Sequence, residues 1–263
     1  MHKIDFMSQN VIVPKISVLA FCFNEENNIK KLIENVSFAH EIILIDNNST
    51  DKTVAIAKEL GATVIIQTTD NKAQQQNLAI NQAQNDWILL LDINEYISPE
   101  LKDEILTKIS DPKSNPLYYI KQTLFFFKKK IEHGEFNNKK RIFLFDKKRH
   151  SFSSNEESNP SITLFGGSNL LKNRIDSYAY KSFDEYNYQL SLLSKKEALE
   201  LYAKNVKPNF YHFLMKPFFS FMNQYFIRLG FLDGKEGYIL AYINSFAVLK
   251  RYLILWLAHN KME

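Results

Sequence analysis

The chain has 263 residues, of which 45% are hydrophobic and 24% are charged, a composition typical of a globular protein with a sizeable core. Its formal net charge of +4 is too small to predict nucleic-acid binding, and a single cysteine, Cys22, excludes an internal disulfide framework and predicts a reducing, cytoplasmic setting. The most apolar tract, 238–258, is long enough to span a bilayer but contains Asn244, Lys250 and Arg251. Each charge near the centre of an inserted helix costs about 2.5–3.5 kcal/mol, so the sequence argues against a transmembrane segment.

The first hundred residues alternate between strand and helix patterns with short connections. Predicted strands cover 16–23, 41–45, 62–67 and 87–91, and predicted helices cover 29–36, 53–60, 72–84 and 99–109. Such alternation is typical of a doubly wound, mostly parallel α/β sheet. The run 87–91 is apolar throughout, which favours a strand covered on both faces.

The second half of the chain has a different texture. Aromatic runs at 117–127 and 140–145 predict two strands that complete the sheet, with a loop between them. The stretch 150–161 is rich in Ser, Asn and Glu and predicts a mobile polar loop. From residue 182 the pattern is helical, with predicted helices over 183–203, within 207–229 and from about Lys235. We therefore predict an α/β domain over 1–180 and a helical C-terminal region over 181–263.

Acidic residues follow two of the predicted strands directly. Asp46 ends the second strand, and Asp92, Asn94 and Glu95 follow the fourth. The carboxyl ends of parallel strands meet at one rim, where open α/β sheets bind ligands, and carboxylate and amide oxygens there can hold a divalent cation and a phosphate. The sequence has neither a P-loop nor a G-x-G-x-x-G motif. An equally weighted alternative is structural, with Asp46 opening a turn and Ser98 capping a helix.

Several motifs together carry a family resemblance. N-E-E-N-N-I, D-N-N-S-T-D-K-T, Q-Q-Q-N-L-A-I and W-I-L-L-L-D-I-N-E-Y look like the nucleotide-binding half of family 2 glycosyltransferases. I-E-H-G-E-F, K-R-I-F-L-F-D-K-K and the C-terminal F-L-D-G-K-E-G resemble the bacterial branch that adds a sugar to the lipopolysaccharide inner core. The resemblance covers nearly the whole chain. It implies a GT-A-like, Rossmann-type, mostly parallel sheet flanked by helices, with a C-terminal helical extension.

The resemblance implies roles only at matching positions. It implies donor-binding residues Asn24, Glu25, Asp46, Gln76, Asp92 and Arg141, metal ligands Asp92 and Asn94, and catalytic residues Glu95 and Glu156. The implied cofactor is a divalent cation, Mg²⁺ or Mn²⁺. The implied donor is a nucleotide-sugar, with a UDP-sugar favoured.

Three positions depart from the family pattern. Asn94 stands where the family has the second aspartate of D-A-D-E, and Gln76 stands where an arginine precedes Asn77. The usual V-H-E is Ser154-Asn155-Glu156, so Glu156, or the adjacent Glu157, is the candidate base. An asparagine oxygen can still bind a hard cation, although more weakly than a carboxylate does.

These observations predict a metal-assisted, inverting glycosyltransferase that moves a hexose to a glycolipid, lipopolysaccharide-core or polysaccharide acceptor. Two alternatives stay open: a weakened homologue that binds sugar nucleotide or glycan without turnover, and an unrelated nucleotidyl-transferring enzyme on a similar sheet. Aromatic residues interleaved with basic ones at 216–228 and 250–256 predict peripheral contact with the cytoplasmic face of the inner membrane. Packing of the same aromatics inside a helical subdomain is the competing interpretation.

Overall fold

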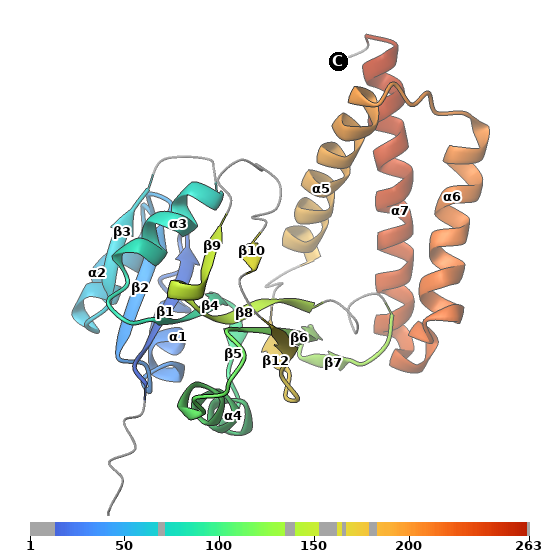
Figure 1. Ribbon diagram of the computed structural model, residues 1–263. Helices are drawn as coiled ribbons and strands as arrows, with labels where there is room; N and C mark the ends of the chain where they lie inside the picture. Colours follow the sequence, from blue (N-terminus) through green and yellow to red (C-terminus); the bar gives the residue numbers. More distant parts are fainter. Residues whose placement is uncertain are drawn as a thin grey trace, which may run out of the picture. The chain divides into compact units, whose positions relative to one another are not determined.

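The structure, a computed structural model, describes residues 14–67, 72–134, 140–152, 162–164, 167–178 and 183–261 (Figure 1). It divides into two compact units. The first unit comprises Met1–Lys121 and Lys140–Ile175, and the second comprises Gln122–Lys139 and Asp176–Glu263. The chain therefore leaves the first unit within one strand and re-enters it at the start of another, so that the segment between them belongs with the C-terminal helices.

The first unit is built from strands and helices that alternate along the chain. Its strands are β1 (Ile16–Cys22), β2 (Glu41–Asp46), β3 (Thr63–Ile66), β4 (Trp87–Asp92), β5 (Glu95–Tyr96), the start of β6 (Leu117–Phe126), β8 (Lys140–Asp146), β9 (His150–Phe152), β10 (Ile162–Leu164), β11 (Ser168–Leu170) and the start of β12 (Ile175–Ser177). Its helices are α1 (Ile29–Asn35), α2 (Thr53–Glu59), α3 (Lys72–Gln82), α4 (Pro99–Ser110) and the short 3₁₀ helix η2 (Lys147–Arg149).

The main sheet has the strand order β3-β2-β1-β4-β8-β6 and continues to β12 and β5. Strands β1 to β4 pair in parallel, whereas β8 pairs antiparallel with both β4 and β6. The predicted mostly parallel α/β sheet is confirmed, and the predicted elements of the first hundred residues are all present. Their ends differ slightly from the observed ones, as element ends usually do.

Alternation along the strands divides the core into two layers. In β1, Val18 and Ala20 pack with α1 and α4, whereas Leu19 packs with α3 on the opposite face of the sheet (Figure 1). Both sets are fully buried. Helix α4 begins where the sequence predicts, because the Ser98 hydroxyl accepts the Leu101 N–H at 3.2 Å and Pro99 occupies the first turn. This packing holds the strands that position the site.

The structure corrects the sequence interpretation in three segments. The predicted loop after β6 contains a further strand, β7 (Lys129–Ile131), which forms a hairpin with β6. The predicted polar loop at 150–161 begins with strand β9, which pairs antiparallel with β10 directly after the loop, and 153–161 lie outside the described residues. Strands β11 and β12 were not predicted, because three-residue strands show too few alternations to produce a periodic signal.

The second unit packs a β-hairpin with helices. Its helical elements are α5 (Phe183–Ala203), α6 (Phe210–Met222), the π-helical turn η3 (Asn223–Ile227), the 3₁₀ helix η4 (Gly230–Asp233) and α7 (Gly234–His259). Phe126 and Ile131 of the hairpin pack with Tyr186 of α5 and Leu240 of α7 in one buried cluster. The Tyr186 hydroxyl donates to Asn244 at 2.6 Å, and Asn244 donates to Gln224 at 2.9 Å, so a polar chain ties α5, α7 and η3 together.

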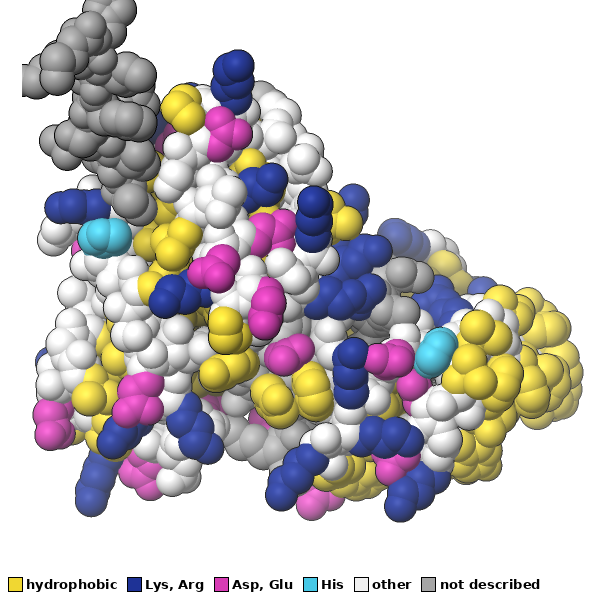
Figure 2. Space-filling model, turned by 90° about the horizontal axis from the view of Figure 1, so that it is seen from below, with side chains coloured by type: hydrophobic (Ala, Val, Ile, Leu, Met, Phe, Trp, Pro, Cys, Tyr) yellow, Lys and Arg dark blue, Asp and Glu magenta, His cyan; other side chains and the backbone are white. Residues whose placement is uncertain are grey.

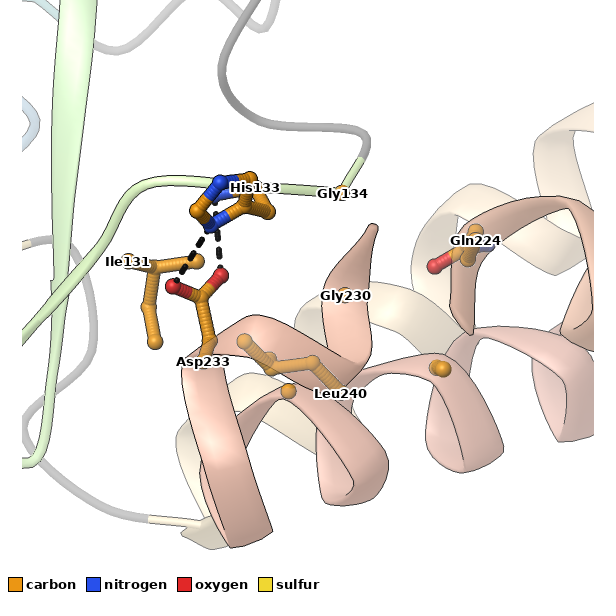
Figure 3. Close-up of a pocket in the computed structure, with 9 residues that line it drawn as sticks. Ile131, His133, Gly134, Gln224, Gly230, Asp233 and Leu240 are labelled. Atoms are coloured by element: carbon orange, nitrogen blue, oxygen red, sulfur yellow. Dashed lines mark hydrogen bonds and ion pairs between the residues drawn. The ribbon is translucent and has the colours of Figure 1, made fainter. Parts of the chain in front are cut away.

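The F-L-D-G-K-E-G segment explains how the hairpin is held. The Asp233 carboxylate, 5% exposed, accepts the backbone N–H groups of Glu132 and His133 at 3.1 and 2.8 Å, and it lies 3.2 Å from the His133 ring (Figure 3). A Cβ at Gly237 would lie 1.9 Å from the Gly230 carbonyl oxygen, so only glycine fits there. His133, Asp233 and the two glycines help to line a cavity of about 10 Å³, room for about one water molecule (Figure 3). In the second unit this motif therefore has a structural role.

The run Gly230–His259 is the one helical stretch in the described part of the chain that is long and apolar enough to cross a membrane. Of its most apolar window, 39% is buried inside the protein. Two charged residues in the middle of its apolar part contact α5, since Lys250 donates to Ser191 at 2.6 Å and Arg251 forms an ion pair with Glu197. Length and composition alone are weak evidence for a span, so the expectation against one stays a prediction.

Candidate functional site

The two predicted strand-end acids lie on either side of β1. In the parallel register Cys22 of β1 pairs with Asp46 of β2, and Phe21 pairs with Asp92 of β4. All three strands end at this rim, so both carboxylates belong to the carboxyl edge of the sheet, as the sequence predicts. This is the position at which open α/β sheets bind ligands.

Asp46 is fully buried and organises the loop that follows β2. Its Oδ2 atom accepts the Ser49 N–H at 2.8 Å, and its Oδ1 atom accepts the Ser49 hydroxyl. Oδ1 also lies 3.5 Å from the Cys22 sulfur. Burial, reinforced by the neighbouring Asp46 charge, raises the pKa of the Cys22 thiol to about 12, so this cysteine is a neutral core residue at physiological pH.

Hydrogen bonds join the loops after β1 and β2 reciprocally. Asn24 donates its N–H to the Ser49 hydroxyl at 2.9 Å, and its side-chain oxygen accepts the Thr50 N–H at 2.9 Å. The Glu25 N–H donates to the Thr53 hydroxyl at 2.7 Å. Asn24 has a left-handed backbone with φ of 53°, a conformation that asparagine tolerates better than most residues. The predicted donor-binding residues Asn24 and Asp46 are thus parts of one bonded loop pair.

Glu25 and Gln76 are largely buried at this edge, with exposed fractions of 8% and 6%. The Glu25 carboxylate accepts the Asn28 amide at 2.7 Å. Gln75, beside the predicted Gln76, donates its side-chain amide to Asn47 at 3.0 Å and so ties α3 to the loop after β2. Gln75 was missed because an amide in a helix gives no periodic or charge signal in the sequence.

Asp92 differs from Asp46 in being exposed at the end of β4. Its carboxylate makes no hydrogen bond or ion pair with any residue that the structure describes, and Asn94, two residues later, is half-buried. Among the described residues there is no cluster of three or more His, Cys, Asp or Glu side chains that could hold a metal ion. One carboxylate and one amide still fit a Mg²⁺ or Mn²⁺ site in which substrate phosphates complete the coordination shell.

Glu95 and Arg141 form an ion pair beneath this loop. The Arg141 side chain contacts both Glu95 oxygens, and its Nη1 donates to the Leu90 carbonyl at 3.1 Å. The Glu95 side chain is 1% exposed and accepts the Asp92 N–H at 2.9 Å. A buried carboxylate held by a guanidinium is poorly placed to accept a proton from substrate, so this geometry favours a positioning role for Glu95. Its predicted catalytic role stays a prediction.

The other predicted catalytic residue, Glu156, lies outside the described residues, as do its neighbours Asn155 and Glu157. The described site therefore consists of two bonded loops around Asp46, an exposed Asp92 and the Glu95–Arg141 pair.

We predict that Asp46→Ala raises the dissociation constant for the donor nucleotide about tenfold, equivalent to about 1.4 kcal/mol. The variant loses both a buried acceptor and the bonds to Ser49 that shape the loop. Calorimetric titration with UDP measures the effect. Asp103→Ala, which removes an exposed acid from α4, serves as the control and should bind as wild type does. An unchanged affinity in folded Asp46→Ala would remove this residue from the site.

A mostly parallel α/β sheet with helices on both faces and acids at its carboxyl edge is the GT-A-like arrangement that the sequence predicts. A profile of the family described as "Glycosyl transferase family 2" matches residues 17–159, more than half of the chain. The protein belongs to this family and is a glycosyltransferase. Enzymes of this family use nucleotide-sugar donors.

Similar proteins extend the match beyond the first unit. A glycosyltransferase of Rickettsia typhi, described as uncharacterised, is 30% identical over 244 residues, which cover 89% of this chain and 84% of the relative. The lipopolysaccharide core biosynthesis glycosyltransferase LpsC of Rhizobium meliloti is 19% identical, over 92% of this chain and 96% of its own length. The crystal structure of S. aureus TarS matches with a TM-score of 0.46 and 18% identity, over 92% of this chain and 50% of TarS.

Proposed function

We propose that this enzyme transfers a hexose from a nucleotide-sugar, with a UDP-sugar favoured, to a glycolipid or polysaccharide acceptor of the lipopolysaccharide-core type. Binding of a nucleotide-sugar donor is supported by one observation: buried Asp46 and exposed Asp92 end the two strands that flank β1. The acceptor part is supported by the name of the R. meliloti relative and by the resemblance of the C-terminal motifs.

The two acids suit different parts of the donor. Asp46 and the loop pair around Asn24 offer buried acceptors and oriented amides, which suit the base or ribose of a nucleotide. Asp92 offers an exposed carboxylate, and with Asn94 it would hold a divalent cation. Such a cation neutralises charge on a leaving diphosphate when it is bound.

The remaining residues keep this arrangement in place. Glu95 fixes the backbone of Asp92 through the Asp92 N–H, and Arg141 fixes Glu95 while also bonding to the Leu90 carbonyl of β4. Asp92 is therefore held rigidly at the strand end although its side chain is exposed. In the proposed inverting reaction a carboxylate takes the proton from the attacking acceptor hydroxyl, and Glu156 is the residue proposed for this step.

A donor screen tests the proposal directly. UDP-, GDP- and nucleoside-diphosphate-heptose sugars are compared by thermal shift with and without manganese, and donor hydrolysis is then measured with the donor that binds. We expect one donor class to stabilise the protein in a manganese-dependent way and to be turned over. Binding without turnover of any donor would instead favour a weakened homologue that only binds sugar nucleotides.

We propose, further, that the second unit contacts the cytoplasmic face of the inner membrane. Hydrophobic side chains gather over its helices, in the yellow field at the right of Figure 2. Phe218 and Phe219 of α6 are 52% and 54% exposed, and Ile227 of η3 is 75% exposed. Large apolar patches exposed to water are typical of surfaces that bind a partner or a membrane. Lys216 and Arg228 are exposed beside them, which suits anionic lipid headgroups.

Wild-type protein is therefore expected to bind vesicles that contain anionic lipid at low ionic strength and to be released by high salt. Phe218→Glu combined with Ile227→Glu should weaken binding at least about tenfold, because burying each apolar side chain contributes about 1.5–3 kcal/mol. Ile66→Glu removes a comparably exposed apolar side chain from the first unit and is the control. Vesicle co-sedimentation measures all three proteins. If wild type stays in solution with anionic vesicles at low salt, the membrane proposal is wrong.

A further inference from the structure

Two lysines face each other across the antiparallel strands β6 and β8. Lys121 of β6 is directly opposite Lys140 of β8 in the register. Directly opposite residues share a face of the sheet, and like charges in such a pair destabilise it. Neither side-chain ammonium forms an ion pair or hydrogen bond with a described residue, and the Lys140 ammonium lies over the Tyr119 ring, 5.1 Å from its centroid.

Two other cations at the ends of β8 are paired with acids. Lys148, just beyond the far end of β8, lies 2.7 Å from Asp86, and Arg141, next to Lys140, is held by Glu95. Lys121 and Lys140 instead form a pair of positive charges, and no described residue provides a counterion for them. A bound anion would remove the repulsion.

The lysine pair lies at the same edge of the sheet as Asp92. Strand β8 runs antiparallel to β4, so the start of β8 lies beside the carboxyl end of β4, as the contact from Arg141 to the Leu90 carbonyl shows. Leu90, Tyr119 and Ile142 pack in one cluster on the α3 face of the sheet. Asp92 is two residues after Leu90, and each lysine is two residues from Tyr119 or Ile142, so all three continue the same face.

The strand order separates this pair from the nucleotide loops. The loops after β2 and β1 come first, Asp92 of β4 comes next, and β8 and β6 lie one and two strands further along the sheet. Neighbouring strands are about 4.8 Å apart, so the lysines lie on the side of Asp92 that is away from the proposed nucleotide. In the proposed function, this side is the one from which an acceptor would approach the transferred sugar.

We propose that Lys121 and Lys140 bind a phosphate monoester carried by the acceptor. This inference rests on the proposed function and adds to it the chemical class of the acceptor. Lysine ammonium groups are compact charges on flexible stems, and two of them side by side match the two negative charges of a phosphate monoester. Arg141 is engaged by Glu95, whereas Lys121 and Lys140 have no ion-pair partner among the described residues.

Calorimetric titration with glucose 6-phosphate and with glucose tests the proposal, using UDP and Mg²⁺ to saturate the donor site. Wild type should bind the phosphate ester at least about tenfold more tightly than glucose, and Lys121→Gln and Lys140→Gln should each reduce this preference several-fold. Lys113→Gln removes an exposed charge before the opposite end of β6 and is the matched control, which should keep the preference. Equal binding of both sugars by wild type, or an equal loss in the control, overturns the proposal.

Two further arms distinguish other sources of the anion. Inorganic phosphate that binds as tightly as glucose 6-phosphate would show a site for free phosphate, and a Lys121→Gln defect seen only with phosphatidic acid vesicles would show a lipid headgroup site. Either result overturns an acceptor phosphate. UDP titration of the same samples tests the proposed function separately from this inference. Wild type that fails to bind UDP contradicts the proposed function. Normal UDP binding without a preference for the phosphate ester contradicts only the inference about the acceptor.

Stability provides an independent measurement. Lys121→Glu replaces the like-charge pair with an opposite-charge pair, so it should raise the Tm of the ligand-free protein by about 1–4 °C while abolishing the preference for glucose 6-phosphate. A higher Tm together with a lost preference for the phosphate ester is the result expected if the two lysines bind an anion at a cost in stability. A lower Tm in folded Lys121→Glu would show that the two lysines do not repel each other, and it would contradict the proposed anion site.

Discussion

Arg141→Met is expected to destabilise the first unit by about 3 kcal/mol and to abolish transfer, because it leaves a buried carboxylate without its cation. The Glu95 side chain is 1% exposed, whereas that of Arg141 is 26% exposed, so the charge that loses its ion-pair partner is the more deeply buried one. The Asp92 N–H would be the remaining bond to Glu95 among those described above. Urea unfolding followed by tryptophan fluorescence measures the change, since Trp87 lies in β4.

A double variant separates the two consequences of this change. Glu95→Gln added to Arg141→Met removes the buried carboxylate charge, so it should restore most of the lost stability. It should not restore the activity, because the Glu95–Arg141 ion pair no longer holds Asp92 in place. A single variant that loses less than about 1 kcal/mol would show that the pair contributes as little as a surface salt bridge.

Asp92→Asn is expected to lower kcat/KM for transfer at least about 100-fold, equivalent to about 2.7 kcal/mol, and to remove any manganese dependence of donor binding. Asp92 supplies the one exposed carboxylate of this loop, and Asn94 supplies only a neutral amide. Wild type should therefore bind manganese appreciably only when a nucleoside diphosphate is present. Asn94→Asp, which restores the second carboxylate, should tighten both metal and donor binding.

Calorimetric titration of UDP with and without manganese compares wild type, Asp92→Asn and Asn94→Asp. The expected order of manganese-dependent tightening is Asn94→Asp, then wild type, then Asp92→Asn with none. Mg²⁺ and Mn²⁺ sites commonly use one or two protein carboxylates with substrate phosphates, so this order follows from the number of charged ligands. Identical curves for wild type and Asn94→Asp, with or without manganese, would defeat the metal-site hypothesis.

Much of the first unit could be predicted because its signals are local. The apolar run ending at Asp92 and the alternating residues of β1 determine strands by short-range pattern, and Ser98-Pro99 marks a helix start. Parallel strands put their carboxyl ends on one rim, so Asp46 and Asp92 were predicted to emerge at the same edge. The register of β1 with β2 and with β4 confirms this prediction.

The difference between these two acids was not predictable. Both follow apolar strands in the sequence, yet Asp46 is fully buried and bonded to Ser49, whereas Asp92 is exposed. Burial depends on which loops cover a strand end, and the covering loop around Asn24 comes from another part of the chain. The burial of Glu95 was likewise not predictable, because its ion-pair partner Arg141 lies 46 residues away in the sequence.

The sequence by itself determined the alternating elements, the acidic strand ends and the helical C-terminal region, because each depends on neighbouring residues. Tertiary structure decided the rest. It joined Gln122–Lys139 to the helical unit, since Leu124 pairs with Ile131 and packs with α5 and α7. It also placed Lys121 opposite Lys140, in a register that follows an irregularity between Tyr118 and Tyr119. Such an irregularity shifts every later pair by one residue, and a one-residue shift moves side chains to the other face of a sheet.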